Sequence, residues 1–302
     1  MARRDQRDEI LRKFDQINVW TRGDERAPHK PLLILYALGR WQRGERSEVQ
    51  FADVAQDVGE LLREFGPPRR SYHPEYPFWR LQADGLWTVE ADAPVEPRQG
   101  HTDPKKSELL KYNARGRFVI PVLAALDADP SVVGEVAQRL LDAHFPESVH
   151  EDILDAVGLS REVQTFQRER RDPGFRKRVL TAYEYRCAVC GYDVRLGANL
   201  LGLDAAHIKW HQAGGPDVES NGLALCVLHH KSFDLGAFTI SADLAVLISD
   251  EVHGSTGLQE TLLRHHAQPL RKPQRPEHVP AGHFLDWHGR QVFRGRARHV
   301  VA

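Results

Sequence analysis

Three short segments in the second half of the chain decide how it folds: residues 187–190 read CAVC, residues 204–208 read DAAHI, and residues 221–234 read NGLALCVLHHKSFD. All three cysteines of the chain lie in these segments. Cys187 and Cys190 form a C-x2-C pair, and Cys226 and His229 form a C-x2-H pair that begins 36 residues after Cys190. Both spacings suit a tetrahedral zinc ion, which accepts thiolate and imidazole ligands. The sequence therefore predicts a closed, structural zinc site.

Two other interpretations of the cysteines are weaker. Three unrelated buried cysteines would pack as small hydrophobic residues, but paired ligand spacings are typical of zinc. A disulfide is disfavoured because the number of cysteines is odd and the start, MARRDQRDEI, lacks the apolar core of a secretory signal. We therefore expect a cytoplasmic protein whose thiolates are kept reduced for a metal.

A second set of polar residues is interleaved with the cysteines. Residues 200–208 (LLGLDAAHI) form an apolar run that predicts a strand with His207 near its end, and Gly214-Gly215-Pro216 marks a turn. Asn221 opens the returning segment, and a short helix is expected from Cys226 onward. Successive helical residues differ by about 100° around the axis, so His229 can face the zinc while His230 faces His207.

This hairpin and helix resemble the HNH, or ββα-metal, endonuclease motif. The resemblance implies that His207 is a general base that activates water, that Asn221 orients the hairpin or the surroundings of the base, and that His230 binds a catalytic divalent ion. The chemistry is consistent on its own terms. Phosphodiester hydrolysis needs a deprotonated nucleophile, which a neutral imidazole can generate, and a hard cation such as Mg²⁺ or Mn²⁺ beside the phosphate oxygens.

The sequence departs from many members of that family at two positions. His229 stands where many have a fourth cysteine, which zinc tolerates, and Ala206 stands where several subfamilies have an acidic metal ligand. Asp204 is a weak substitute for that ligand, because its odd offset from His207 places it on the other face of the strand. Asp234, four residues after His230, is either an orienting partner for an imidazole or an ordinary exposed carboxylate.

Composition sets wider limits. The chain has 302 residues, of which 41% are apolar and 27% charged, so we expect a globular α+β protein of about two domains. No run of 18 apolar residues is present, so no membrane span is predicted. The expected division is a recognition domain at residues 1–150, a linker at residues 151–170 and a nuclease domain at residues 171–302.

Charge is unevenly distributed although the net charge is only −1. Residues 122–159 hold eight acidic residues and one arginine, whereas residues 168–178 read RERRDPGFRKR and the chain after Arg264 is also basic. Runs of charge are usually solvated surface. Because these basic runs flank the nuclease motif, we interpret them as contacts to a DNA backbone.

The first half has a different signature. Pro31 opens an apolar helix after R26-A-P-H29-K30, residues 76–81 read YPFWRL and predict a strand, and residues 98–107 read RQGHTDPKKS. Further helices are expected at residues 7–18, 49–65 and 131–145, with Ser131 as the cap of the last one. A return strand is expected at residues 86–89.

These stretches resemble the sulfur-binding domain of phosphorothioate-dependent, McrA-like Type IV restriction enzymes, which couple such a domain to an HNH domain. A phosphorothioate carries sulfur in place of one phosphate oxygen, and sulfur is a weaker hydrogen-bond acceptor. An apolar cup of Tyr76, Pro77 and Phe78 would offer no hydrogen-bond donor to a phosphate oxygen. Burying sulfur there would cost less free energy than burying oxygen. We assign three groups of substrate-binding candidates: the cup itself; Arg26, His29 and Lys30 for the remaining phosphate charge; and Gln99, His101 and Lys105 for groove edges and backbone.

Alternatives remain at this stage. The aromatic run could be ordinary strand core, or Tyr72, Tyr76 and Trp79 could hold a flipped methylated or hydroxymethylated cytosine. A non-catalytic zinc module that only binds DNA is a third reading, which the intact His207, Asn221 and His230 oppose. Since one HNH site cuts one strand of a duplex, a homodimer is the expected assembly.

Overall fold

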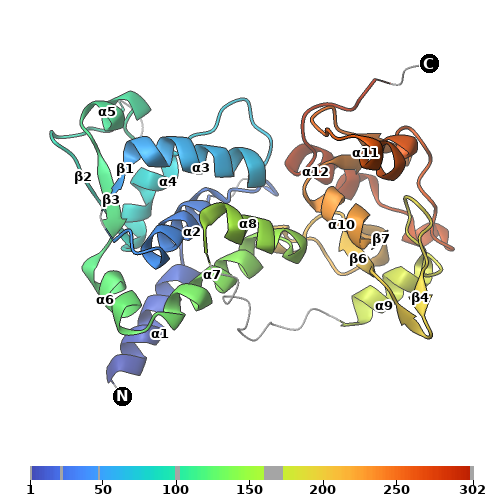
Figure 1. The fold of residues 1–302 in the computed structure, drawn as a ribbon, viewed down its shortest axis with the longest axis horizontal. Helices are drawn as coiled ribbons and strands as arrows, with labels where there is room; N and C mark the ends of the chain where they lie inside the picture. Colours follow the sequence, from blue (N-terminus) through green and yellow to red (C-terminus); the bar gives the residue numbers. More distant parts are fainter. Residues whose placement is uncertain (1, 21–22, 47, 99–102, 160–172, 300–302) are drawn as a thin grey trace. The chain divides into compact units, whose positions relative to one another are not determined.

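A computed structural model of the chain describes residues 2–20, 23–46, 48–98, 103–159 and 173–299. The chain divides into two compact units, residues 1–167 and residues 168–302, which are described separately below. Each unit combines helices with small antiparallel sheets, in agreement with the expected α+β class (Figure 1). Among the described residues, we find no helix with both the length and the apolar character that crossing a bilayer requires.

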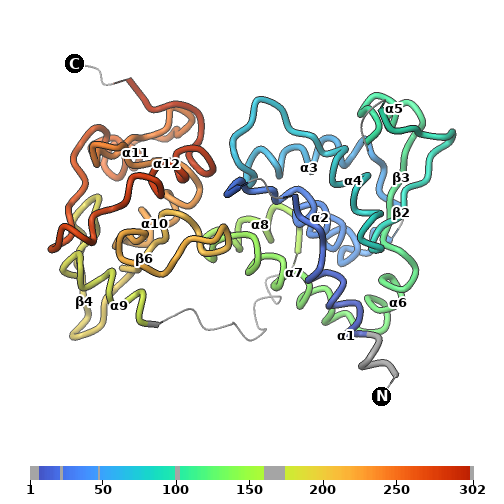
Figure 2. The backbone as a smooth tube through the Cα atoms, turned by 180° about the vertical axis from the view of Figure 1, so that it is seen from behind, coloured from blue at the N-terminus to red at the C-terminus, as the bar shows by residue number. Residues whose placement is uncertain are grey.

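The first unit is mainly helical, and its helices α1 and α7 lie alongside one another in both views (Figures 1 and 2). Its helices are α1 (Ala2–Asp15), α2 (His29–Gln42), α3 (Phe51–Phe65), α4 (Glu75–Arg80), α5 (Lys106–Lys111), α6 (Ile120–Ala128), α7 (Ser131–His144) and α8 (His150–Val157). Its strands β1 (Val49–Gln50), β2 (Trp87–Glu90) and β3 (Arg115–Phe118) pair antiparallel in the order β1-β3-β2.

Helix α2 forms the centre of this unit, as its nearly continuous apolar sequence predicts. Eleven of its fourteen residues are buried, and Pro31 lies in the first turn, where the missing N–H has no helical acceptor to lose. Helix α8 packs against α2 at Gly39, where an added Cβ would lie 2.0 Å from the carbonyl oxygen of Val157. Apolar burial keeps α8 in the first unit, so the start of the segment expected as a linker, residues 151–157, is helical.

The segment expected as a strand at residues 76–81 is a helix instead. Pro74 precedes α4 and Pro77 lies in its first turn, where the fixed φ of proline suits a helix and no amide hydrogen is needed. Phe78 then points into the core, with its ring 4.9 Å from that of Phe51 and 6.0 Å from that of Trp87. The return strand was predicted correctly and is β2.

The other boundaries differ from the expectations by small amounts. The helix expected at residues 49–65 begins only at Phe51, because Val49 and Gln50 pair with β3. Ser131 is the first residue of α7 and not its cap. The N-cap is Pro130, which has no capping side chain, and Oδ1 of Asp129 just before it accepts hydrogen bonds from the Ser131 amide at 3.0 Å and from its hydroxyl at 2.6 Å.

The second unit contains the expected hairpin and helix. Strand β6 (Leu203–His207) pairs antiparallel with β7 (Gly222–Cys226), so that His207 lies opposite Gly222, and α10 (Val227–Asp234) follows at once. The remaining elements are α9 (Pro173–Ala182), β4 (Arg195–Leu196), β5 (Asn199–Leu200), β8 (Phe238–Ile240), β9 (Val246–Ile248), α11 (Thr256–Thr261) and α12 (Gly282–Gln291).

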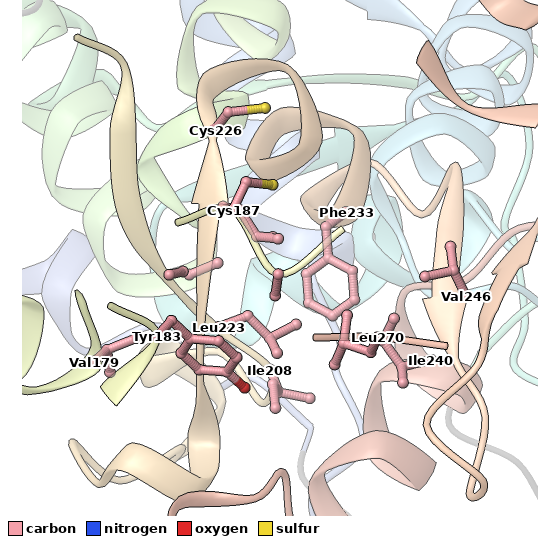
Figure 3. Close-up of a cluster of buried hydrophobic side chains, with 14 of the residues drawn as sticks. Val179, Tyr183, Cys187, Ile208, Leu223, Cys226, Phe233, Ile240, Val246 and Leu270 are labelled. Carbon is pink, nitrogen blue, oxygen red and sulfur yellow. The ribbon is translucent and has the colours of Figure 1, made fainter. Parts of the chain in front are cut away.

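The core of the second unit lies under this hairpin and helix. Figure 3 shows Phe233 of α10 pointing into a cluster that includes Leu223 of β7 and Ile208, all of them fully buried. Cys187 and Cys226 lie at one end of the cluster, and their sulfur atoms are turned toward the same side. Packing of α10 on the hairpin therefore fixes both the apolar core and the end at which the cysteines meet.

Candidate functional site

The four predicted zinc ligands come together in the second unit. The ligand atoms of Cys187, Cys190, Cys226 and His229 all lie within 4.8 Å of one another. The Nδ1 atom of His229 is 3.1 Å from the sulfur of Cys226 and 3.6 Å from that of Cys187, and the sulfurs of Cys190 and Cys226 are 4.0 Å apart. Ligands on about 2.3 Å bonds to a tetrahedral zinc are separated by roughly 3.8 Å, so the donor set fits such an ion.

The surroundings of these donors favour metal binding. The Nε2 atom of His229 lies 2.9 Å from the backbone oxygen of Thr261, which can only accept, so Nε2 carries the hydrogen and Nδ1 presents its lone pair to the sulfurs. Hydrogen bonds from Cys190 and Cys226 lower the pKa of the Cys187 thiol, and the hydrogen bonds of Cys190 to Cys187 and Cys226 raise the pKa of the Cys190 thiol, so the closely spaced sulfurs favour a thiolate at Cys187. The residues therefore form a possible metal site with three sulfurs and one nitrogen.

His207, the predicted general base, lies at the end of β6 with 12% of its side chain exposed. Its Nε2 atom is 2.7 Å from Oδ1 of Asp217, and its ring stacks on that of Phe175 with centroids 4.1 Å apart and planes inclined by 16°. The ring of His211 lies 5.9 Å away, and its Nδ1 is 3.7 Å from the same Asp217 oxygen. The donor atoms of His207, His211 and Asp217 lie within 4.8 Å of one another.

Asn221 is fully buried and holds the loop of the hairpin together. Its Oδ1 accepts a hydrogen bond from the amide of Lys209 at 2.9 Å, and its Nδ2 donates to the carbonyl oxygens of Lys209 and Pro216, both at 3.0 Å. Gly215 passes so close that an added Cβ would lie 1.9 Å from the Lys209 oxygen. These contacts tie the Asn221 side chain to the backbone of the loop.

His230 lies on α10, one residue after the metal-type ligand His229. Its Nε2 atom is 3.3 Å from Oδ2 of Asp234, whose side chain is only 2% exposed. Asp234 is therefore a buried partner of an imidazole and not an exposed helix carboxylate. Asp204, in contrast, is 53% exposed and pairs with Arg176, whose Nε is 2.7 Å from its Oδ1, so it lies on the outer face of β6 as its offset predicts.

The predicted sulfur pocket of the first unit is only partly supported by the geometry. Tyr76 is half-buried, and its ring stacks on that of His73 with centroids 4.7 Å apart. The guanidinium of Arg80 lies 4.7 Å from the same ring, and that of Arg98 lies 5.8 Å from it. Phe78 is fully buried in the core and does not line a surface cup, because the helix turns it away from Tyr76.

An ion pair with Asp103 fixes Arg80, one of the two arginines beside Tyr76. Arg80 donates from Nε and Nη2 to the two oxygens of buried Asp103, at 2.7 and 2.5 Å. Burial, with the charges of Arg69, His73 and Arg80, lowers the pKa of His29 to about 4. His29 is therefore neutral near pH 7, and any contact that it makes to a phosphate would be a hydrogen bond and not an ion pair.

Two of the remaining predicted substrate-binding residues, Lys30 and Arg26, are less exposed to a ligand than the sequence suggests. Nζ of Lys30 is 2.5 Å from Oδ2 of Asp84, so its charge is compensated inside the unit. Arg26 is buried and donates to the Phe65 carbonyl oxygen at 2.7 Å. Lys105 is exposed at the start of α5. Gln99 and His101 lie outside the described residues.

Comparison with known families divides the chain in the same way. Residues 7–162 match the family of ScoMcrA-like DNA sulfur-binding domains, which is more than half of the chain. The chain belongs to that family. Residues 187–241, which contain the four metal-type ligands together with His207, Asn221 and His230, match the HNH endonuclease family.

Solved structures that match the chain include sulfur-binding domains of two McrA proteins, each complexed with phosphorothioated DNA. The domain of ScoMcrA is 21% identical, with a TM-score of 0.45, over 51% of this chain and 96% of that one. The domain of SprMcrA is 24% identical, with a TM-score of 0.45, over 53% of this chain and 98% of that one. The modification-dependent TagI restriction endonuclease is 29% identical, with a TM-score of 0.29, over 44% of this chain and 41% of that one. No curated protein gives a significant match.

The sequence alone missed several residues at both sites. In the HNH domain it missed Asp217 and His211, which belong to the loop of the hairpin and have no fixed ligand spacing to His207. In the sulfur-binding domain it missed the Arg80–Asp103 pair. Tyr76 and Arg80 are four residues apart, a spacing that brings side chains together on a helix but not on the strand that was expected.

Proposed function

We propose that the chain is a modification-dependent HNH endonuclease of the Type IV, McrA-like kind, which binds phosphorothioated duplex DNA and hydrolyses a phosphodiester bond nearby. The observation that carries this proposal is the union of two parts in one chain. Residues 7–162 belong to a DNA sulfur-binding family, and residues 187–241 form an HNH hairpin and helix in which His207 is partly exposed and hydrogen-bonded to a carboxylate.

Hydrolysis would begin with the transfer of a proton from water to His207. Asn221 would keep the loop in place during this step, because its three hydrogen bonds are all made to loop backbone. His230, backed by buried Asp234, would hold a divalent ion such as Mg²⁺ or Mn²⁺. When bound, that ion would supply positive charge to the phosphate oxygens and to the leaving oxygen.

The cysteine cluster would hold a structural zinc ion and take no part in the reaction. Cys187 and Cys190 precede the hairpin, whereas Cys226 and His229 lie at the junction of β7 and α10. A four-coordinate ion at Cys187, Cys190, Cys226 and His229 would pin these segments together and leave no open position for a substrate. The placement of His230 would then follow from the placement of its neighbour His229.

Sulfur recognition would take place around the half-buried ring of Tyr76, with buried Pro77 as its neighbour in α4. The tyrosine ring offers an apolar face, and the proline has no amide hydrogen to donate, so a phosphate oxygen placed there would lose hydrogen bonds that sulfur makes only weakly. His29 and the arginines beside Tyr76 would contact the other phosphate oxygens, and Lys105 would contact the neighbouring backbone. Arg26 and Lys30 would support this surface from below, since both are bonded within the domain.

Cleavage of both strands would need two active sites. One HNH centre hydrolyses one phosphodiester bond at a time, so we propose that two copies of the chain act on one duplex. Analytical ultracentrifugation with and without phosphorothioated DNA measures how many copies of the chain bind one duplex.

The proposed function is tested by cleavage of matched duplexes that differ in one sulfur atom. An unsatisfied oxygen costs about 1–3 kcal/mol, which corresponds to roughly a 5- to 150-fold preference for the phosphorothioated duplex. His207→Ala should bind the modified duplex with unchanged affinity and cut neither duplex. Equal cleavage of both duplexes by the wild type, or preference for a duplex with methylated cytosine, would contradict the proposal.

A further inference from the structure

The carboxylate of Asp217 lies against the base that the proposed function assigns. We propose that Asp217 is a positioning residue for hydrolysis: it fixes the tautomer and the direction of the His207 ring. This inference rests on the proposed function, because it takes His207 as the group that accepts the proton of the attacking water. Asp217 lies in the loop of the hairpin, and no spacing of ligands in the sequence predicts a functional residue at that position.

The position of Asp217 is fixed from both sides by backbone contacts. Asn221 holds the carbonyl oxygen of Pro216, the preceding residue, at 3.0 Å. Arg178 of α9 donates from Nη2 to the carbonyl oxygen of Asp217 itself at 2.7 Å, and its Nε is 3.0 Å from Oε1 of Glu219. The Asp217 side chain is 29% exposed, yet its backbone is bound to α9. Hydrogen bonds to the backbone of the loop therefore hold the Asp217 carboxylate next to His207.

The hydrogen bond between the two side chains determines which nitrogen can act as the base. An ionised carboxylate only accepts hydrogen bonds, so the hydrogen at the 2.7 Å contact belongs to Nε2 of His207. The proton taken from water must then pass to Nδ1. The stack on Phe175 keeps the ring in one plane, and the carboxylate stabilises the imidazolium that forms.

The proposed step balances without a further reactant. A water O–H bond breaks as its proton moves to Nδ1 of His207, and the water oxygen forms a bond to phosphorus. The bond between phosphorus and the leaving oxygen breaks, the leaving oxygen takes a proton from bulk water, and the imidazolium later returns its Nδ1 proton to solvent. Asp217 keeps its hydrogen bond to Nε2–H throughout and is never protonated.

Several charged groups near His207 bear on its protonation. His211 lies on the same side, with its Nδ1 3.7 Å from Oδ1 of Asp217 and its side chain 61% exposed, so when protonated it competes for the carboxylate. Arg178 and Glu219 compensate one another at the base of the loop. Arg176 of α9 pairs with Asp204 on the other face of β6. Of these groups, Asp217 has a carboxylate oxygen 2.7 Å from Nε2 of His207.

The experiment compares the steady-state kinetics with which the full chain and its variants cleave a phosphorothioated duplex across pH. Asp217→Asn should lose about 10- to 100-fold in kcat with little change in KM. Its acidic limb should move to lower pH by up to about one unit, because loss of the carboxylate destabilises the imidazolium. Asp217→Glu should recover part of the rate. Asp204→Asn, which removes a carboxylate from the same hairpin, is the matched control and should cut as the wild type does.

A second measurement does not depend on activity. Long-range ¹H–¹⁵N correlation spectra of the wild-type chain should show neutral His207 with its hydrogen on Nε2, and an Nδ1–H tautomer would overturn the proposal. A wild-type rate and pH profile for Asp217→Asn, with His207→Ala inactive, would overturn the role of Asp217 alone. An active His207→Ala would overturn the proposed base as well. Binding of Mn²⁺ or Zn²⁺ that both Asp217→Asn and His211→Ala abolish would make the cluster a metal site and overturn the proposal.

Discussion

The two candidate sites of this chain are built in different ways. In the HNH domain, four donor atoms that lie within 4.8 Å of one another join the segment before the hairpin to the junction of β7 and α10. In the sulfur-binding domain, the surface around Tyr76 is held by ring stacking, by two arginines and by the Arg80–Asp103 ion pair. In the first arrangement the proposed metal ion would be shared by all four donors, whereas the second is a sum of separate contacts. We therefore expect that loss of one metal-type ligand unfolds the HNH domain as a whole. Loss of one residue around Tyr76 should weaken stability or DNA binding only in part.

Removal of the proposed zinc ion should give the largest effect. In small domains a structural zinc contributes about 10 kcal/mol or more of folding free energy, so chelation or Cys226→Ser should abolish the cooperative unfolding of residues 168–302. Calorimetry with and without a chelator, together with metal analysis of the purified chain, measures this. The unfolding transition of residues 1–167 serves as the internal control and should not move. A chelator-resistant second transition would contradict the structural role of the metal.

A pair of aromatic substitutions in α4 sharpens the comparison inside the sulfur-binding domain. Phe78→Ala should destabilise the domain by about 3–5 kcal/mol, because it opens a cavity between Phe51 and Trp87. Tyr76→Ala should change the free energy of unfolding far less, since its ring is half-buried, but should weaken binding of a phosphorothioated duplex. Urea unfolding and fluorescence anisotropy separate the two effects. The opposite pattern would place Phe78, and not Tyr76, at the DNA.

The contrast between the domains also explains what the sequence could predict. The spacing of Cys187, Cys190, Cys226 and His229 matches the geometry of a metal site, which hardly depends on the rest of the fold, so the cluster was predicted residue by residue. The segment at residues 76–81 has no such constraint. Its aromatic residues favour a strand by propensity, but the two prolines and the burial of Phe78 produce a helix. Asp217 was missed because the conformation of the loop, and not a fixed spacing in the sequence, brings it to His207.

The smallest expected effect is the pH dependence of stability in the sulfur-binding domain. Burial and nearby cations lower the pKa of His29 to about 4, and burial and Arg26 lower that of His144 to about 4. In the unfolded chain both would titrate near 6.5, so between about pH 6.5 and 4 the unfolded state binds protons that the folded state does not. Stability is then complete above pH 6.5 and is lost as the pH falls toward 4.

This loss should be on the order of 1 kcal/mol for each histidine after allowance for solvent screening. Urea unfolding at several pH values gives the free energy of unfolding of residues 1–167 at each pH. Between about pH 6.5 and 4 this free energy should change less steeply with pH for His29→Gln and for His144→Gln than for the wild type. His253→Gln, an exposed histidine in the other unit, is the matched control. If His29→Gln left the slope unchanged, the pKa of His29 would be the same in the folded and the unfolded chain, and His29 would then be available to a phosphate as a cation below about pH 6.5.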